Sequence, residues 1–156
     1  CTHKSKFEYD LAAASTRQAD FSFQVSREWY EDQEFLENAL DRYEKFLTII
    51  KHHPKEFTSP AIDVDLVWHT HMSMSDQYKS DCLALLGRIV YHDDTDQDRA
   101  EGSKLVSAFR MSNERWLAMF GEAQLVAGTG YIGKFVRVST KELHEALSAG
   151  EDGPSG

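Results

Sequence analysis

The chain has 156 residues, 26 of them acidic and 17 lysine or arginine, so its formal net charge is −9. Hydrophobic residues make up 41% of the sequence and aromatic residues 12%, which suits one folded domain and excludes an acidic disordered tail. An acidic surface would repel a nucleic-acid backbone, and no apolar stretch approaches the roughly 20 residues of a membrane-spanning helix.

Residues 1–25 show no lasting hydrophobic period, and at most a short helix begins near Leu11. The next segment predicts a long helix that starts at an N-cap, Ser26, and ends where Pro54 interrupts it. Its apolar side chains recur every three or four positions, which is the spacing of one helix face: Trp29, Leu36, Leu40, Tyr43, Leu47 and Ile50.

Three further helices are predicted downstream. Pro60 favours a helix over residues 61–72, and Ser75 or Asp76 can cap a third helix. The third helix has an apolar face made of Tyr78, Cys82, Leu85, Leu86, Ile89 and Val90. A fourth helix is expected over residues 99–120, and Gly121 stands where a helix-ending glycine belongs.

The C-terminal part differs in composition, because it has several glycines and then β-branched residues. We expect a short strand at 131–138, a short helix at 141–147 and a disordered tail at 149–156. The predicted fold class is mainly α: a compact bundle of about four helices with a short irregular or β-like C-terminal segment. The predicted divisions are a helical domain at 21–125, an extension at 126–148 and the tail at 149–156.

Two cysteines are too few for a disulfide framework or a zinc finger. The first residues also lack the basic, apolar and small-residue regions of a signal peptide. We therefore expect an intracellular, cytoplasmic setting. Cys82 lies on an apolar face, where a free cysteine behaves as a small hydrophobic residue.

Three of the seven histidines, His69, His71 and His92, lie among aspartates. These aspartates are Asp63, Asp65, Asp81, Asp93 and Asp94. Imidazoles and carboxylates together can bind a divalent cation or serve as acid and base. The alternative is a structural network in which these groups hydrogen-bond to one another and to helix ends.

The local backbone decides which of these residues can share one ion. On a helix, Asp65 and His69 lie on one face, whereas His69 and His71 point about 200° apart. On an extended segment, His69 and His71 point the same way. We favour the helix, and a further ligand then has to come from the segment around His92. The predicted metal ligands are Asp65, His69, His71, His92 and Asp93, and the metal is zinc or iron.

The run from Pro60 to His71 (PAIDVDLVWHTH) resembles the signature of the glycine-rich domain-containing protein-like family. The resemblance covers about residues 21–125. It continues through Tyr78, Asp81-Cys82, Gly87-Arg88, His92 to Thr95, Phe109, Trp116 and Phe120-Gly121. It implies a regulatory protein of a family with no established catalytic activity, and it groups several residues as one unit. We expect five residues of this region to support the ligands or the core around them: Trp68, Tyr78, Asp81, Cys82 and Asp94.

Three functional hypotheses follow. The first is a binding or regulatory module whose His/Asp cluster holds one divalent metal. The second is a metal-dependent enzyme of hydrolase or oxygenase type that uses the same cluster. The third is a protein-interaction scaffold in which the cluster is structural. The expected partner is a protein or a small molecule, with no nucleic acid bound through this domain.

Overall fold

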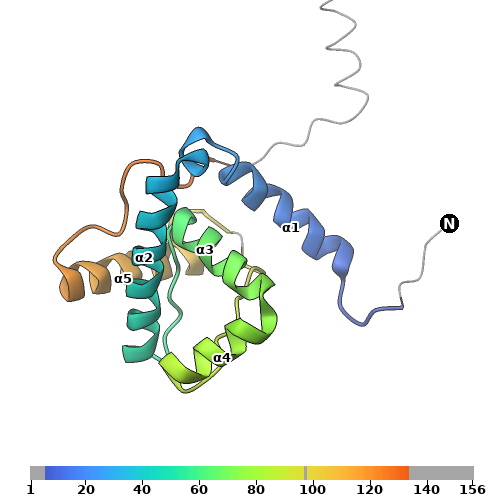
Figure 1. Cartoon of the computed structure of the whole chain (residues 1–156). Helices are drawn as coiled ribbons and strands as arrows, with labels where there is room; N and C mark the ends of the chain where they lie inside the picture. Colours follow the sequence, from blue (N-terminus) through green and yellow to red (C-terminus); the bar gives the residue numbers. More distant parts are fainter. Residues whose placement is uncertain (1–5, 97, 134–156) are drawn as a thin grey trace, which may run out of the picture.

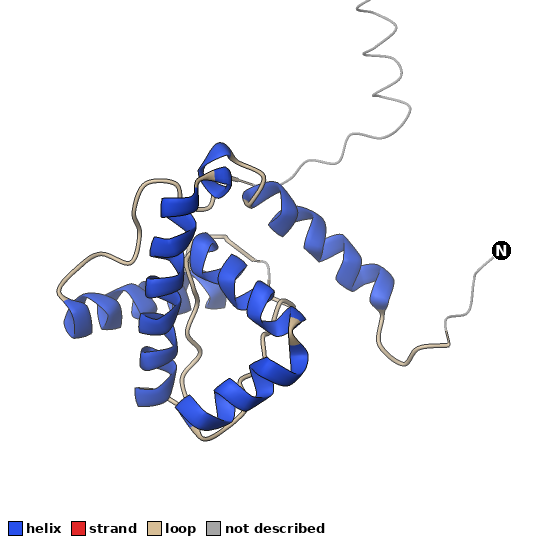
Figure 2. Ribbon diagram, in the orientation of Figure 1, coloured by secondary structure: helices blue, strands red, loops and turns tan. Residues whose placement is uncertain are grey.

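The computed structural model describes residues 6–96 and 98–133. These residues form five α-helices and one 3-10 helix, and none of them is in a strand (Figures 1 and 2). The predicted mainly α fold class is therefore confirmed. Most of the strand expected at 131–138, and all of the helix and tail expected beyond it, lie outside the described residues. None of the described helices is long and apolar enough to span a membrane.

Helix α2 (Gln33–His52) is the centre of the fold, because most other helices pack against it. Helices α3 (Ile62–Ser73) and α4 (Ser75–Leu86) form a V-shaped pair beside α2 (Figure 1). Helix α5 (Lys104–Phe120) crosses α2. Their buried faces meet in one apolar core, which includes Phe46, Ile49, Val64, Trp68, Cys82 and Trp116. The core fixes α3 in place, and α3 carries the candidate site.

The predicted start of the long helix is wrong, because the chain forms two separate helices there. A short 3-10 helix, η1 (Glu28–Glu31), is followed by α2, whose N-cap is Asp32. The Asp32 carboxylate accepts a hydrogen bond from the backbone N–H of Phe35 at 2.7 Å, which satisfies one free donor of the first turn. Ser26 is therefore not the N-cap of the long helix, and its hydroxyl instead donates to the carbonyl of Phe23 at the end of α1 at 2.9 Å. Trp29 lies off the α2 stripe with 42% of its surface exposed.

Three other helix ends also differ from the prediction, and one of them is the start of α5, which begins at Lys104 after the N-cap Ser103 rather than near residue 99. Helix α4 begins after Met74, so Ser75 and Asp76 lie inside it rather than capping it. It ends at Leu86 because Gly87 adopts a left-handed backbone conformation with φ of 72°. Residues 89 and 90 are consequently free to leave the helix, and this segment leads directly into the candidate site.

Helix α1 (Leu11–Gln24) is longer than the short helix that the sequence indicated. The Asp10 carboxylate caps it by accepting a hydrogen bond from the backbone N–H of Ala13 at 2.9 Å. The helix extends away from one end of α2 (Figure 1). Several of its side chains nevertheless reach the elements around α3, and they form one wall of a cavity described below.

Candidate metal centre

Residues 61–72 were predicted to form a helix, and α3 confirms this expectation. No side chain caps its first turn. Instead, the backbone N–H of Ile62 donates to the carbonyl of Thr129 at 3.1 Å. The helical backbone places Asp65 and His69 on one face, one turn apart, and directs His71 elsewhere.

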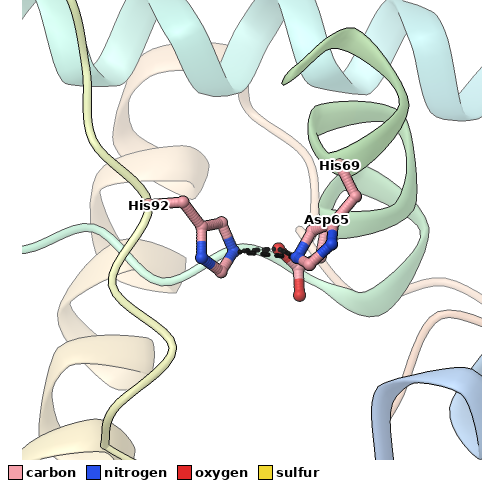
Figure 3. A group of neighbouring side chains, drawn as sticks. All are labelled: Asp65, His69 and His92. Atoms are coloured by element: carbon pink, nitrogen blue, oxygen red, sulfur yellow. Dashed lines mark hydrogen bonds and ion pairs between the residues drawn. The ribbon is translucent and has the colours of Figure 1, made fainter. Parts of the chain in front are cut away.

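Three ligand atoms converge beside α3: Asp65 Oδ1, His69 Nε2 and His92 Nε2 (Figure 3). His92 Nε2 lies 2.8 Å from Asp65 Oδ1 and 3.2 Å from His69 Nε2. The third separation, between His69 Nε2 and Asp65 Oδ1, is 3.8 Å. We call these three residues the triad.

A hydrogen-bonded chain through the core positions His92. The Trp68 indole N–H donates to the Tyr78 hydroxyl at 2.9 Å, and that hydroxyl donates to the carbonyl of Val90 at 2.7 Å. Both Tyr78 and Val90 are buried. The chain fixes the segment that leaves α4, and the His92 ring then packs beside the Trp68 ring with centroids 4.6 Å apart.

Two residues of α1 complete the surroundings of the triad, and the sequence analysis missed both. The Phe21 ring stacks on the His69 ring, with centroids 4.2 Å apart and planes 20° apart. The Arg17 guanidinium donates to the Asp94 carboxylate at 3.2 Å. Residues 1–25 show no sustained period, and Phe21 lies 48 positions before His69, so no local signal links them.

The two histidines of the triad have opposite pKa shifts. Burial lowers the pKa of His69, and the neighbouring His92 adds to this effect against the attraction of Asp65. Burial also acts to lower the pKa of His92, but its hydrogen bond to Asp65 and the nearby carboxylates outweigh burial and raise it. A metal ligand has to be the neutral imidazole, so the lowered pKa favours the ligand form of His69.

The other predicted ligands lie apart from the triad. His71 Nε2 is 3.1 Å from the Asp81 carboxylate on α4, and His71 Nδ1 is 3.0 Å from the Tyr43 hydroxyl on α2. Asp93 is exposed and accepts hydrogen bonds from the backbone and side chain of Thr95. Neither residue belongs to the convergent group that the described residues form.

The remaining supporting residues have structural contacts. Asp81 ties α4 to His71, and Asp94 ties the segment after α4 to Arg17 on α1. Cys82 is a buried free cysteine in the apolar core. Asp63, which the sequence groups with the histidines, pairs instead with Arg42 in the interior.

The triad borders a cavity of about 660 Å³. The triad lines it together with Asp93 and Asp94, and α1 contributes Arg17 and Phe21 to the lining. The triad side chains are 15–22% exposed, so the core does not seal them off. An ion held by the triad would therefore be accessible to a small molecule.

The triad geometry fits a tetrahedral transition metal. Ligand atoms about 2.0–2.1 Å from such an ion lie about 3.3 Å from one another. The three separations in the triad, 2.8, 3.2 and 3.8 Å, scatter around this value. Two imidazoles and one carboxylate also form a donor set that zinc and non-haem iron use, with positions left open for other ligands.

Comparisons with known proteins agree with the resemblance noted in the sequence. The profile of the glycine-rich domain-containing protein-like family matches residues 2–81. Glycine-rich domain-containing proteins 1 and 2 of Arabidopsis thaliana are each 40% identical to the chain, over 131 and 124 residues. These alignments cover 81% and 77% of this chain but only 16% of each relative. No solved structure matches the chain.

The matched range begins before residue 21 and ends at Asp81, so it includes α1, α2 and α3. Asp65 and His69 lie inside it, and His92 lies beyond its end. The chain spans about a sixth of the length of these two relatives. The family profile and the 40% identity together show that the chain belongs to the glycine-rich domain-containing protein-like family.

Proposed function

We propose that this helical domain is a binding or regulatory module that holds one divalent transition metal, zinc or iron, through Asp65, His69 and His92. The observation that carries the proposal is the convergence of three ligand atoms from two separate segments, all within 4.8 Å of one another. When bound, the metal would act as a Lewis acid with at least one open position.

The contact between the two imidazoles supports this proposal. His69 Nε2 and His92 Nε2 face each other at 3.2 Å, so one proton at most fits between them. A cation between the rings and Asp65 would use the lone pairs of both nitrogens and a carboxylate oxygen. The ring stack with Phe21 and the contact with Trp68 orient the two imidazoles before the metal binds.

A metal-dependent enzyme is the second candidate, and the cavity beside the triad favours it. An open metal position that faces a cavity can polarise a bound ligand or activate water. The scaffold hypothesis explains the hydrogen bond between His92 and Asp65 without a metal, and it requires no cavity. The intracellular setting remains part of the proposal and is supported by the buried free thiol of Cys82.

Metal analysis of protein purified without chelators tests the proposal. We expect close to one equivalent of zinc or iron per chain, and a higher melting temperature when zinc is added to the metal-free protein. His69→Ala should abolish both effects. His52→Ala is the matched control, because His52 is exposed at the end of α2.

Two results would contradict the proposal. The first is substoichiometric metal together with no change in melting when zinc or iron is added. The second is a His69→Ala variant that binds zinc as the parent protein does. A scaffold would show lower melting in the variant and no metal in either protein.

A further inference from the structure

The cavity beside the triad is lined by both charged and apolar side chains. The triad lines it together with Arg17, Asp93 and Asp94, and further charged residues are Asp20, Glu56, Arg88, Asp96 and Arg99. The apolar part of the lining, which we call the apolar wall, includes Ile50, Phe57, Leu105, Phe109 and Leu125. A volume of about 660 Å³ falls in the range of small-molecule sites. A ligand that fills this cavity therefore needs one polar end and an apolar body.

The charge at the metal-loaded triad decides whether the polar end of the ligand is anionic or cationic. A divalent ion with two neutral imidazoles and one carboxylate keeps one net positive charge. Of the other carboxylates that line the cavity, Asp94 is paired with Arg17 at 3.2 Å and Glu56 is paired with Arg115. The charges of Asp20, Asp93 and Asp96 are partly offset by Arg88 and Arg99 in the same lining. The open metal position then decides the sign, because an anionic group can coordinate the metal, whereas an ammonium group has no lone pair for it and is repelled by its charge.

We infer that the cavity binds a small amphipathic anion, whose carboxylate coordinates the metal and whose hydrocarbon body packs on the apolar wall. This inference rests on the proposed metal site and adds the class of ligand to it. The carboxylate replaces water at the open position, and the apolar body supplies affinity by leaving water. No bond in the ligand is made or broken.

A chain-length series of carboxylates tests the inference on zinc-loaded protein. Acetate, butyrate, hexanoate and octanoate share one head group, so their affinities isolate the contribution of the apolar wall. Each buried methylene should tighten binding about fourfold, so octanoate should bind up to about four-thousandfold tighter than acetate if all of its additional methylenes are buried. Calorimetry measures the affinities, and the visible spectrum of cobalt-loaded protein reports whether the carboxylate reaches the metal.

Three controls separate the contribution of the metal from that of the apolar wall. Metal-free protein should lose most of its affinity for octanoate. Phe57→Asp should remove the dependence on chain length and keep the zinc affinity, because Phe57 lines the apolar wall and is exposed enough to tolerate substitution. Leu117→Asp is the matched control, since Leu117 is exposed and lies outside the cavity wall.

The outcomes separate this inference from the proposed metal site. Failure to bind zinc overturns both. Zinc binding with equal affinities for acetate and octanoate overturns the ligand class and leaves the metal site standing. Octylammonium that binds as tightly as octanoate also overturns the inference, because the acidic groups of the cavity would then be selecting a cation.

Discussion

Two aspartates on α3, Asp63 and Asp65, are separated by one residue and have opposite surroundings. Asp63 is 1% exposed, and its Oδ2 accepts a hydrogen bond from Arg42 Nε at 2.7 Å. Asp65 borders the cavity and faces His69 and His92. Because positions two apart on a helix point about 200° apart, one side of α3 stabilises the fold and the other forms the candidate site.

The two sides also differ in how deeply their polar groups are buried and in how many segments these groups join. Arg42 pairs with Asp63, donates to the carbonyl of Gln124 and lies over the Trp116 ring, so it joins α2, α3 and the segment after α5. The triad has fewer partners of this kind and stays partly exposed. Substitutions on the buried side should therefore affect folding, and those on the cavity side should affect metal binding.

The largest expected effect comes from replacing Asp63 by asparagine. Asp63→Asn leaves the Arg42 guanidinium buried without its counter-charge, which costs about 3–5 kcal/mol of the free energy of unfolding. Asp65→Asn removes a carboxylate from the first turn of α3 and should cost about 0.3–1 kcal/mol. Urea unfolding of both metal-free variants measures the difference. Equal losses in the two variants would contradict the division of α3 into two sides.

The same pair of variants should give the reverse order for metal. Folded Asp63→Asn, studied below its melting temperature, should bind zinc as the parent protein does. Asp65→Asn should bind zinc much more weakly, because an amide oxygen is a poorer ligand for this ion than a carboxylate. Zinc titration monitored by calorimetry makes the comparison.

Tyr78 connects the core to the cavity side of α3, and removal of its hydroxyl should have the next largest effect on stability. Tyr78→Phe leaves the Trp68 N–H and the Val90 carbonyl without their buried partner, which should cost about 1–3 kcal/mol. The looser segment should also weaken zinc binding about tenfold, as loss of residues that orient ligands commonly does. Tyr91→Phe is the matched control, since Tyr91 is 84% exposed beside His92. Unchanged zinc affinity in Tyr78→Phe would limit Tyr78 to folding.

The sequence was sufficient to predict the shared face of Asp65 and His69, because a four-residue spacing on a helix depends only on local geometry. It also named His92 but was unable to place it, since an antiparallel helix pair can return the chain to either end. The turn at Met74 and the bond from Tyr78 to Val90 resolve that ambiguity.

Contacts between distant segments have no signal in the sequence comparable to the four-residue spacing of Asp65 and His69. Arg42 and Asp63 are 21 positions apart, and only the crossing of α2 and α3 brings them together. The stack of Phe21 on His69 depends likewise on where α1 lies. The wrong N-cap at Ser26 has a local cause: two residues of similar capping strength, Ser26 and Asp32, precede the helix, and tertiary packing decides between them.

Phe21→Leu tests whether α1 belongs to the cavity side. Loss of the ring stack should weaken zinc binding by up to about tenfold, which corresponds to the usual strength of an aromatic pair. The metal-free variant should also have a His69 pKa closer to its ordinary value, because burial is the main cause of its lowering. Phe23→Leu is the control on the same helix, because Phe23 is exposed and lies outside the cavity wall. If the two variants bind zinc equally, Phe21 does not orient His69.

The smallest effect is a pH dependence confined to the cavity side in metal-free protein. Burial acts to lower the pKa of His92, but Asp65, Asp94 and Asp93 outweigh burial and raise it. The protonated His92 therefore stabilises the fold below about pH 6.5, and this contribution is lost as pH rises through the folded-state pKa. The lowered pKa of His69 acts in the opposite sense, since its contribution is lost as pH falls below about 6.5.

NMR titration should therefore place the midpoints of His69 and His92 on opposite sides of the ordinary histidine value, and Asp65→Asn should lower the midpoint of His92. Zinc should remove both titrations near neutral pH, because it binds the neutral imidazoles. Coincident midpoints in the metal-free protein would contradict the bond between Asp65 and His92 as the source of the difference.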